Sequence, residues 1–470
     1  MFEKDLRSIR DYVLNTILPT PEETQRALDL FKDLSSRLEP LLKELNYPFR
    51  ISLEGSVSKD THIRNDTDLD IFVLIRYDGM TKEWLEGLVN KMLEVLSPFK
   101  PKRLYASHPY LRFKEDGIEV DVVPAYMAFS VDEIKTAVDR TVFHTAFVKS
   151  KLTKEMNNDV RLLKKFFKGI GVYGAEIKTE GFSGYLTELL IIYYGSFIDA
   201  VKGIANWKPP QVIDLLKMFE DIRDYLRVFE KKPLIFPDPV DPRRNAAAAL
   251  SPKSLSTAVL ACRRFLERPS INYFYPKTSV GSWDDAEQSI NNRRTAVVGY
   301  LIIYEEGTSP DVIWGELKKC LRRGQSLLKQ FDFEVVDSDL WCDEVSLGVL
   351  LYEVVPRELP LYTLHVGPKS FRTEDAGKFL EKYLGVEGEG SVGPWINDLG
   401  DLVVMKVRKY LTPYDVLLGE AGKILMARHI RSYEVVKICN LKPIYDSSDE
   451  FKVWFYRFIS KRPQWLSDTT

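Results

Sequence analysis

The sequence is poor in cysteine and has almost no net charge. Its four cysteines, Cys262, Cys320, Cys342 and Cys439, form no CxxC pair, so their spacing fits neither a zinc site nor a dense disulfide framework. We therefore expect a reducing compartment. The 66 Lys and Arg residues nearly balance the 68 Asp and Glu residues. Any polyanionic partner must then be bound by a local basic patch and not by overall charge.

Long apolar runs are also missing. The most apolar stretch, 189–201, contains Asp199 and is too short to span a bilayer. The first residues, MFEKD, are charged from the start and lack the apolar region of a signal peptide. We expect a cytoplasmic protein that does not associate with membranes.

The chain is long enough for about three folded domains, with 470 residues of which 45% are hydrophobic. A capping box at Thr20-Pro21 predicts a helix that kinks near Pro40. The remaining segments predict β-strands at 49–53, 68–75, 118–123, 296–304 and 346–355, and helices at 82–96, 160–168, 185–202, 252–266 and 311–330. We predict an α+β multidomain protein with domains at 1–145, 146–268 and 269–470, and a flexible joint at 385–393.

Three acidic residues on β-rich segments point to a metal site. Asp68 and Asp70 lead into the apolar run 71–75, and alternation along a strand places both carboxylates on one face. Asp121 lies in another apolar segment, where a charge is costly unless it is paired or bound to metal. Together they predict two Mg²⁺ ions about 3.5–4 Å apart, an arrangement that supports phosphoryl displacement.

An Asp-x-Asp pair alone is typical of a solvated turn or strand end. Gly55-Ser56, just before the pair, adds a close backbone approach and a hydroxyl for phosphate oxygens. The metal-site prediction requires that the three carboxylates lie together and are not locked into ion pairs with arginines.

Gly-Ser, Asp-x-Asp and a distal Asp resemble the polymerase-beta-type nucleotidyltransferase superfamily. Further motifs narrow the resemblance: RTVFHT at 140–145, DVRLLK at 159–164, KGIGVYGAE at 168–176, GFSGY at 181–185 and DPVDPRRN at 238–245. In this order they are similar to the archaeal (class I) tRNA CCA-adding enzymes. The resemblance implies a polymerase-beta-like nucleotidyltransferase head, a helical neck for base recognition, and an α+β body and tail that bind tRNA. It also implies template-independent addition of C-C-A to the tRNA 3′ end from CTP and ATP, with release of pyrophosphate.

The resemblance implies roles for individual residues. Asp68, Asp70 and Asp121 would be the catalytic, metal-binding carboxylates. The nucleotide would be bound by Ser56, Lys59, Thr141, His144, Lys164, Tyr173 and Arg244, with Arg244 at the base edge. Lys59 and Asp68 stand where the family usually has Arg and Glu, and both replacements keep the charge.

From the residues alone, other interpretations of these side chains stay open. His144 also fits a structural histidine, and Lys164 belongs to a basic helical face of the kind that is usually solvated. Arg243 and Arg244 also fit a cap of the Asp241 turn through a local ion pair. As a base reader, a guanidinium can select cytosine and adenine, because both present an exocyclic amine beside an unprotonated ring nitrogen.

Basic and aromatic residues interleave in the C-terminal third, at 406–410, 428–431 and 454–458. We expect 454–458 to contribute mainly to a core, and the two basic clusters to contact RNA phosphates by the shape of an A-form helix. The oligomeric state, including a homodimer, stays open.

Two other functions stay open. A poly(A) polymerase or oligoadenylate-type synthetase would share the catalytic head but use ATP only and extend without stopping. A non-catalytic RNA-binding protein could retain the fold, although the intact set of carboxylates disfavours it.

Overall fold

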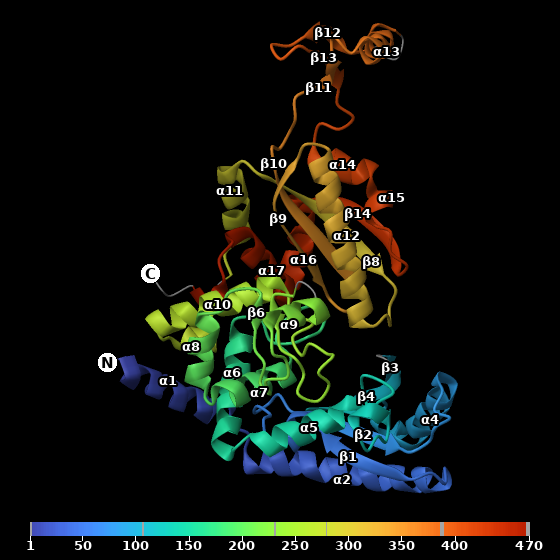
Figure 1. Ribbon diagram of the computed structural model, residues 1–470, viewed down its shortest axis with the longest axis vertical. Helices are drawn as coiled ribbons and strands as arrows, with labels where there is room; N and C mark the ends of the chain where they lie inside the picture. The colour runs from blue at the N-terminus through green and yellow to red at the C-terminus, as the bar shows by residue number, and fades with distance from the viewer. Residues whose placement is uncertain (1, 106–107, 230–231, 279, 386–389, 467–470) are drawn as a thin grey trace. The chain divides into compact units, whose positions relative to one another are not determined.

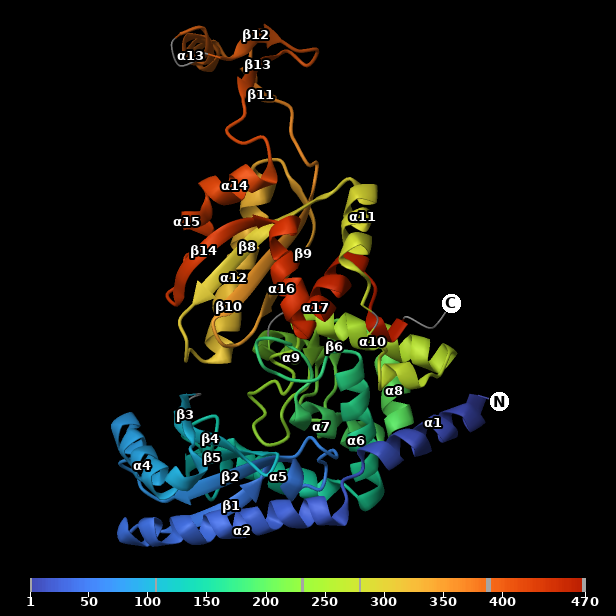
Figure 2. The same cartoon turned by 180° about the vertical axis from the view of Figure 1, so that it is seen from behind.

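The computed structural model describes residues 2–105, 108–229, 232–278, 280–385 and 390–466. These residues form two compact units, one of 2–278 with 463–466 and the other of 280–462. Figure 1 and Figure 2 show their helices and strands from opposite sides. The predicted α+β multidomain class is confirmed. The division into three domains stays a prediction, and its first boundary, residue 145, falls inside helix α5 (Arg140–Lys151).

A five-stranded mixed sheet forms the N-terminal part of the first unit, in the order β1-β2-β5-β4-β3. Its strands are β1 (Phe49–Glu54), β2 (Asp68–Ile75), β3 (Lys102–Tyr105), β4 (Pro109–Glu115) and β5 (Ile118–Tyr126). The central strands β2 and β5 are parallel, and the other neighbours are antiparallel. One face packs against helices α2 (Pro21–Glu44) and α4 (Lys82–Val95), and α5 contributes to the cluster on the other. Strands β3 and β4 were not predicted.

The start of α2 shows half of the predicted capping box. The Thr20 side chain accepts a hydrogen bond from the Glu23 backbone N–H. The Glu23 carboxylate does not cap the helix and instead accepts from the Asn65 N–H and the Thr67 hydroxyl. The helix continues through Pro40 to its end.

The rest of the first unit is mostly helical. Its helices are α1 (Phe2–Ile17), α5, α6 (Lys154–Gly169), α7 (Gly184–Tyr194), α8 (Phe197–Ala205), α9 (Ile222–Phe229) and α10 (Pro252–Glu267), with the short strands β6 (Gln211–Val212) and β7 (Leu234–Ile235). Phe166 and Phe167 of α6 lie at the centre of its aromatic core. The single helix predicted over 185–202 is wrong, because Gly195 ends α7 in the left-handed region (φ +86°) and Ser196 caps α8.

The second unit contains two antiparallel sheets, with orders β14-β8-β10-β9 and β11-β13-β12. The strands are β8 (Ala296–Tyr304), β9 (Glu334–Cys342), β10 (Leu347–Val355), β11 (Tyr362–Lys369), β12 (Val392–Ile396), β13 (Asp401–Val407) and β14 (Ile430–Lys437). The helices are α11 (Trp283–Arg293), α12 (Pro310–Gln330), α13 (Thr373–Leu384), α14 (Pro413–Gly419), α15 (Ala421–Ile424), α16 (Lys442–Ser447) and α17 (Asp449–Ser460). Of the predicted joint at 385–393, residues 386–389 lie outside the described residues.

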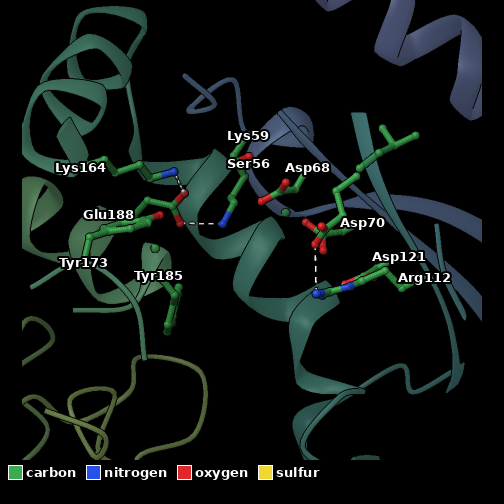
Figure 3. A pocket seen from close by; sticks show the side chains of 14 residues that line it. Ser56, Lys59, Asp68, Asp70, Arg112, Asp121, Lys164, Tyr173, Tyr185 and Glu188 are labelled. Atoms are coloured by element: carbon green, nitrogen blue, oxygen red, sulfur yellow. Dashed lines mark hydrogen bonds and ion pairs between the residues drawn. The ribbon is translucent and has the colours of Figure 1, made fainter. Parts of the chain in front are cut away.

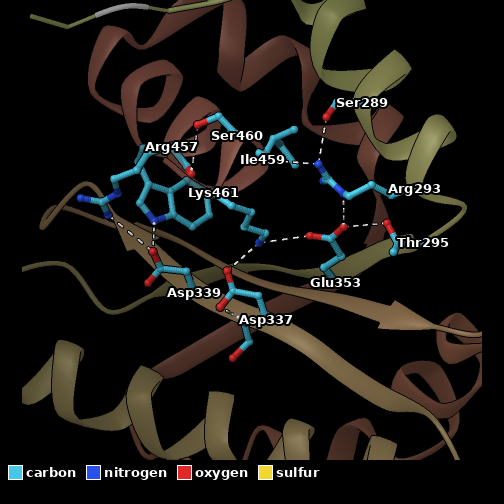
Figure 4. Close-up of polar contacts among 12 residues, drawn as sticks. Ser289, Arg293, Thr295, Asp337, Asp339, Glu353, Arg457, Ile459, Ser460 and Lys461 are labelled. Atoms are coloured by element: carbon cyan, nitrogen blue, oxygen red, sulfur yellow. Dashed lines mark hydrogen bonds and ion pairs between the residues drawn. The ribbon is translucent and has the colours of Figure 1, made fainter. Parts of the chain in front are cut away.

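The larger sheet of this unit has a hydrophobic layer on each face. One layer contains α12, α14 and α15, and the other contains α11, α16 and α17. Trp454, Phe455 and Phe458 of α17 are buried in the second layer, as expected for that segment. The fully buried Glu353 of β10 is neutralised by Arg293 at 2.7 Å and Lys461 at 3.1 Å, which ties α11 and the end of α17 to the sheet (Figure 4).

No helix among the described residues combines the length and apolar character needed to cross a membrane. All four cysteines lie in described segments and are free thiols, three of them buried.

Candidate active site

The parallel pair β2 and β5 brings the predicted carboxylates together. Asp70 is paired in register with Asp121, and Asp68 with Glu119. The three aspartates border one cavity of about 320 Å³, shown in Figure 3. Its lining consists of Gly55, Ser56, Lys59, Asp68, Leu69, Asp70, Arg112, Glu119, Asp121, Lys164, Tyr173, Gly184, Tyr185 and Glu188. Eight other polar residues, four of them predicted from the sequence, therefore share the cavity with the aspartates, and they come from both the sheet and the helical part of the unit.

Gly55 begins the short helix α3 (Gly55–Ser58) directly against the Asp70 carboxylate. Its φ of +68° favours glycine, and a Cβ built on it would lie 1.7 Å from Oδ2 of Asp70. The close approach seen here is to the carboxylate, and the predicted approach to phosphate oxygens stays a prediction. Ser56 follows it and lines the same cavity.

Asp121 does not meet the expectation that arginine leaves the carboxylates free. Arg112 donates from Nε to Oδ1 and from Nη2 to Oδ2, both at 2.7 Å, and its Nη1 lies 3.0 Å from Glu119. The cause is the register of β4 with β5, which places Arg112 directly opposite Asp121. This bidentate pair raises the pKa of Arg112. By contrast, neither Asp68 nor Asp70 has an ion pair within 4 Å in the described parts of the chain.

The unpaired aspartates titrate close to neutrality. Burial first, and then the negative charges of Asp121 and Asp68, raise the pKa of Asp70 to about 7. Asp68 is the more exposed of the two. Its pKa is raised to about 6, by burial first and then by Asp66 and Glu119. A cation bound between these oxygens would relieve their repulsion and favour the charged forms.

The carboxylate oxygens are donors of the kind that Mg²⁺ prefers. Within the described segments, no three Asp, Glu, His or Cys side chains are already arranged to hold a metal ion. Both Asp121 oxygens are engaged by Arg112, so Asp121 can join Asp68 and Asp70 as a ligand only when this ion pair opens. The donor set fits the ion once Arg112 no longer holds the Asp121 oxygens.

Two lysines line the opposite side of the cavity and share a buried glutamate that the sequence analysis missed. Lys59 Nζ lies 2.6 Å from Glu188 Oε2, and Lys164 Nζ lies 3.7 Å from Oε1. Burial lowers the pKa of Lys164 to about 8, although Glu188 works against this shift. Burial acts to raise the pKa of Glu188, but Lys59 and Lys164 together bring it below its usual value. Tyr173 completes this side, and burial raises its pKa.

Three predicted nucleotide-binding residues, Thr141, His144 and Arg244, do not line the cavity. His144 and Arg244 both bind the fully buried Asp238, at 2.9 and 2.6 Å. The His144 ring stacks on Tyr185, whose hydroxyl donates to the same carboxylate.

This cluster therefore adjoins the cavity through Tyr185. Thr141 lies in the first turn of α5, one turn before His144. The backbone N–H groups of Arg243 and Arg244 donate to Asp241, but the ion pair of the alternative interpretation does not form with either residue, because the Arg244 guanidinium pairs with Asp238 and Asp241 pairs with Arg140.

Comparison with known proteins decides the family. Residues 158–275 match the model of "tRNA nucleotidyltransferase, second domain", and residues 294–436 match "CCA-adding enzyme, C-terminal domain". A CCA-adding enzyme of Saccharolobus islandicus is 34% identical over 97% of this chain and 100% of its own. That of Sulfurisphaera tokodaii is 35% identical over 98% and 100%. The chain belongs to the CCA-adding enzymes.

A third relative, the CCA-adding enzyme of Saccharolobus shibatae, is 37% identical over 85% of this chain and 89% of its own. A solved chain of the Cid1 poly(U) polymerase overlaps 57% of this chain and 96% of its own, with a TM-score of 0.46 and 14% identity. The assignment rests on the CCA-adding relatives. The prediction of an enzyme that adds C-C-A to tRNA without a template is thereby confirmed, and the alternatives of a poly(A) polymerase and a non-catalytic protein are set aside.

Proposed function

We propose that the cavity between the three aspartates and the two lysines is where this CCA-adding enzyme transfers a nucleotide to the tRNA 3′ end. The observation that carries the proposal is the charge arrangement. Asp68, Asp70 and Asp121 lie on adjacent strands, and Lys59 and Lys164 line the same cavity beside Glu188, away from Asp121 in Figure 3. A nucleoside triphosphate has a highly charged phosphate tail and a reacting α-phosphorus. Cationic side chains are needed for the tail, and carboxylates that hold metal ions are needed at the reacting phosphorus.

The chain's own residues divide the work. Lys59, Lys164, Ser56 and Tyr173 bind the β- and γ-phosphates and so hold the leaving pyrophosphate. In-line displacement places the attacking 3′-hydroxyl on the side of the α-phosphorus opposite the leaving pyrophosphate. In this cavity that is the side on which Asp121 lies. Asp121 is the group placed to orient that hydroxyl and accept its proton.

The proposed cofactor is Mg²⁺, held by Asp68, Asp70 and, after Arg112 releases it, Asp121. When bound, the ions supply charge neutralisation at the α-phosphate and lower the pKa of the attacking hydroxyl. Divalent metal use is expected of this family, whereas the choice of Mg²⁺ belongs to the proposal.

Base selection is assigned to the cluster around Asp238. Asp238 Oδ2 accepts one hydrogen bond from Arg244 Nη1 and also pairs with His144 Nε2, so the carboxylate anchors one end of the guanidinium and leaves its other N–H groups to read the edges of cytosine and adenine. Thr141 and His144 are proposed to contact the nucleotide beside it. In this proposal the hydrogen bond of His144 to Asp238 is compatible with a role in nucleotide binding, because Asp238 orients the side chains of both His144 and Arg244.

The tRNA is proposed to contact basic residues of the second unit, in a cytoplasmic enzyme. Of the two predicted clusters, Lys409 is paired with Glu420, and Arg431 with Glu305. To bind tRNA, Lys409 and Arg431 would have to leave these glutamates and pair with phosphates of the RNA backbone. The oligomeric state is not part of the proposal.

The experiment is incorporation of labelled CTP and ATP, with Mg²⁺, into tRNA that lacks its last three nucleotides. Asp70→Ala should abolish incorporation and leave tRNA binding intact, because Asp70 sits at the cavity and makes no ion pair that holds the described structure together. Substantial turnover by this variant would refute the assignment of the cavity.

A further inference from the structure

Glu188 joins three segments of the first unit at one buried carboxylate. It lies in α7, with 1% of its side chain exposed. Lys59, at the end of α3, donates to Oε2 at 2.6 Å, and Thr61 donates to Oε1 at 2.8 Å. Lys164 of α6 donates to the Thr61 carbonyl and hydroxyl oxygens at 3.0 and 3.1 Å. Figure 3 shows Glu188 between the two lysines.

The charges of this cluster do not cancel. One carboxylate faces two ammonium groups, so one positive charge remains next to the cavity. Two buried ammonium groups without the carboxylate would repel each other and lose their hydration, which favours a neutral lysine. Glu188 therefore does more than neutralise: it lets both lysines stay charged at fixed positions while leaving a surplus that an anion can bind.

We propose that Glu188 is a positioning residue that holds the Lys59 and Lys164 ammonium groups in place for the triphosphate of the incoming nucleotide. This inference rests on the proposed function of the cavity. Glu188 itself is not expected to touch the nucleotide, because its oxygens already accept hydrogen bonds and its negative charge would repel phosphate.

The first test is Glu188→Gln, which keeps the shape and removes the charge. The measurement is the Kd of α,β-methylene CTP without tRNA, by calorimetry. We expect it to weaken about ten- to hundredfold, the usual effect of losing charge-assisted hydrogen bonds. In turnover, KM should rise while kcat changes little. Glu155→Gln is the matched control, because Glu155 is exposed at the start of α6 in the same unit.

The pH profile separates positioning from a merely structural role. The charged groups that act on Lys164 are Glu188, Lys59, Arg161 and Lys168, and of these only Glu188 favours its protonated form. Its pKa is about 8 with the carboxylate present and must fall when the charge is removed. Analogue binding should therefore decline above about pH 8 in the unaltered enzyme and at lower pH in Glu188→Gln.

A double-mutant cycle with Lys164→Met gives a further check. If Glu188 acts through the lysines, Glu188→Gln should weaken binding much less when Lys164 is already replaced. Equal losses in both backgrounds would overturn the proposal. So would a Glu188→Gln variant that melts at lower temperature but binds the analogue as tightly as the unaltered enzyme.

Thr61→Val covers the case in which Glu188→Gln does not fold. It keeps every charge but removes the hydroxyl that links Glu188 to Lys164. It should weaken analogue binding severalfold without moving the pH profile, and unchanged affinity would refute the inference. Incorporation of CTP by the unaltered enzyme is measured in parallel. Absence of incorporation would refute the proposed function, whereas normal incorporation together with unaffected variants would refute only the role of Glu188.

Discussion

Gly55→Ala tests whether the position of the Asp70 carboxylate sets the rate of nucleotide transfer. The substitution adds one methyl group at the tightest backbone approach of the cavity. Its Cβ would lie 1.7 Å from Asp70 Oδ2, whereas Cβ atoms almost never come within 3.0 Å of another heavy atom. The carboxylate or the Gly55 backbone must therefore move by roughly 1 Å or more.

Two effects of this substitution have separate magnitudes. The φ of +68° is unfavourable for alanine and should reduce stability by about 1–2 kcal/mol. Misplacing a reacting group by about 1 Å can reduce the rate about 100-fold. We expect the second effect to dominate kcat, because Asp70 is proposed to hold the metal ion at the reacting phosphate.

Gly117→Ala is the matched control. Gly117 also has a positive φ, +84°, but an added Cβ would meet nothing within 4 Å. Both variants should lose thermal stability, Gly55→Ala at least as much as Gly117→Ala because of its added contact with Asp70, while only Gly55→Ala should lose incorporation of labelled CTP into shortened tRNA. Near-normal turnover by a folded Gly55→Ala enzyme, or an equal loss in Gly117→Ala, would refute the reasoning.

Three more outcomes follow from the same geometry. Arg112→Gln should tighten Mn²⁺ binding to the substrate-free enzyme about fivefold, because a half-exposed ion pair is worth about 1 kcal/mol; weaker binding in electron paramagnetic resonance titrations would show that Asp121 is not a ligand. Mn²⁺ affinity of the unaltered enzyme should rise from pH 6 to pH 8, because protons leave Asp68 and Asp70, whose pKa values are about 6 and about 7, and no longer compete with the ion; a flat profile would contradict this. Arg244→Ala should relax discrimination against UTP and GTP, while exposed Arg243→Ala should not, and unchanged selectivity of both would place base reading elsewhere.

The catalytic strands could be predicted because their local pattern is strong. The segment 68–75 combines alternating aspartates with an uninterrupted apolar run, and the structure gives a strand with the same bounds. The same holds for 296–304, which is β8. In both cases burial on two faces selects apolar residues along the whole strand, and that selection is visible without any knowledge of the neighbours.

Glu188 could have been suspected but not assigned. It is the one charged residue in the apolar segment 186–192, and a charge within a buried helix usually has a partner. Its partners are 127 and 129 residues away, at Thr61 and Lys59, and come from a turn that no periodicity predicts. Its place in an apolar segment shows that such a residue needs a cation, but only the fold, which brings the end of α3 and helix α6 against α7, shows which ones.

The pairing of Arg112 with Asp121 was within reach of the sequence. Asp116-Gly117 is a strong two-residue hairpin signal, and both residues have the positive φ values that a type I′ turn requires. Such a turn fixes the register, since Glu115 opposite Ile118 leads by successive pairs to Arg112 opposite Asp121. Because strand β4 was not predicted, the position of Arg112 in the sheet was not predicted either. The prediction that all three carboxylates are free of arginine was therefore wrong for Asp121. The error is informative, because Asp121, which is proposed to lie nearest the attacking hydroxyl, is the one carboxylate of the three that the fold pairs with a cationic side chain, Arg112.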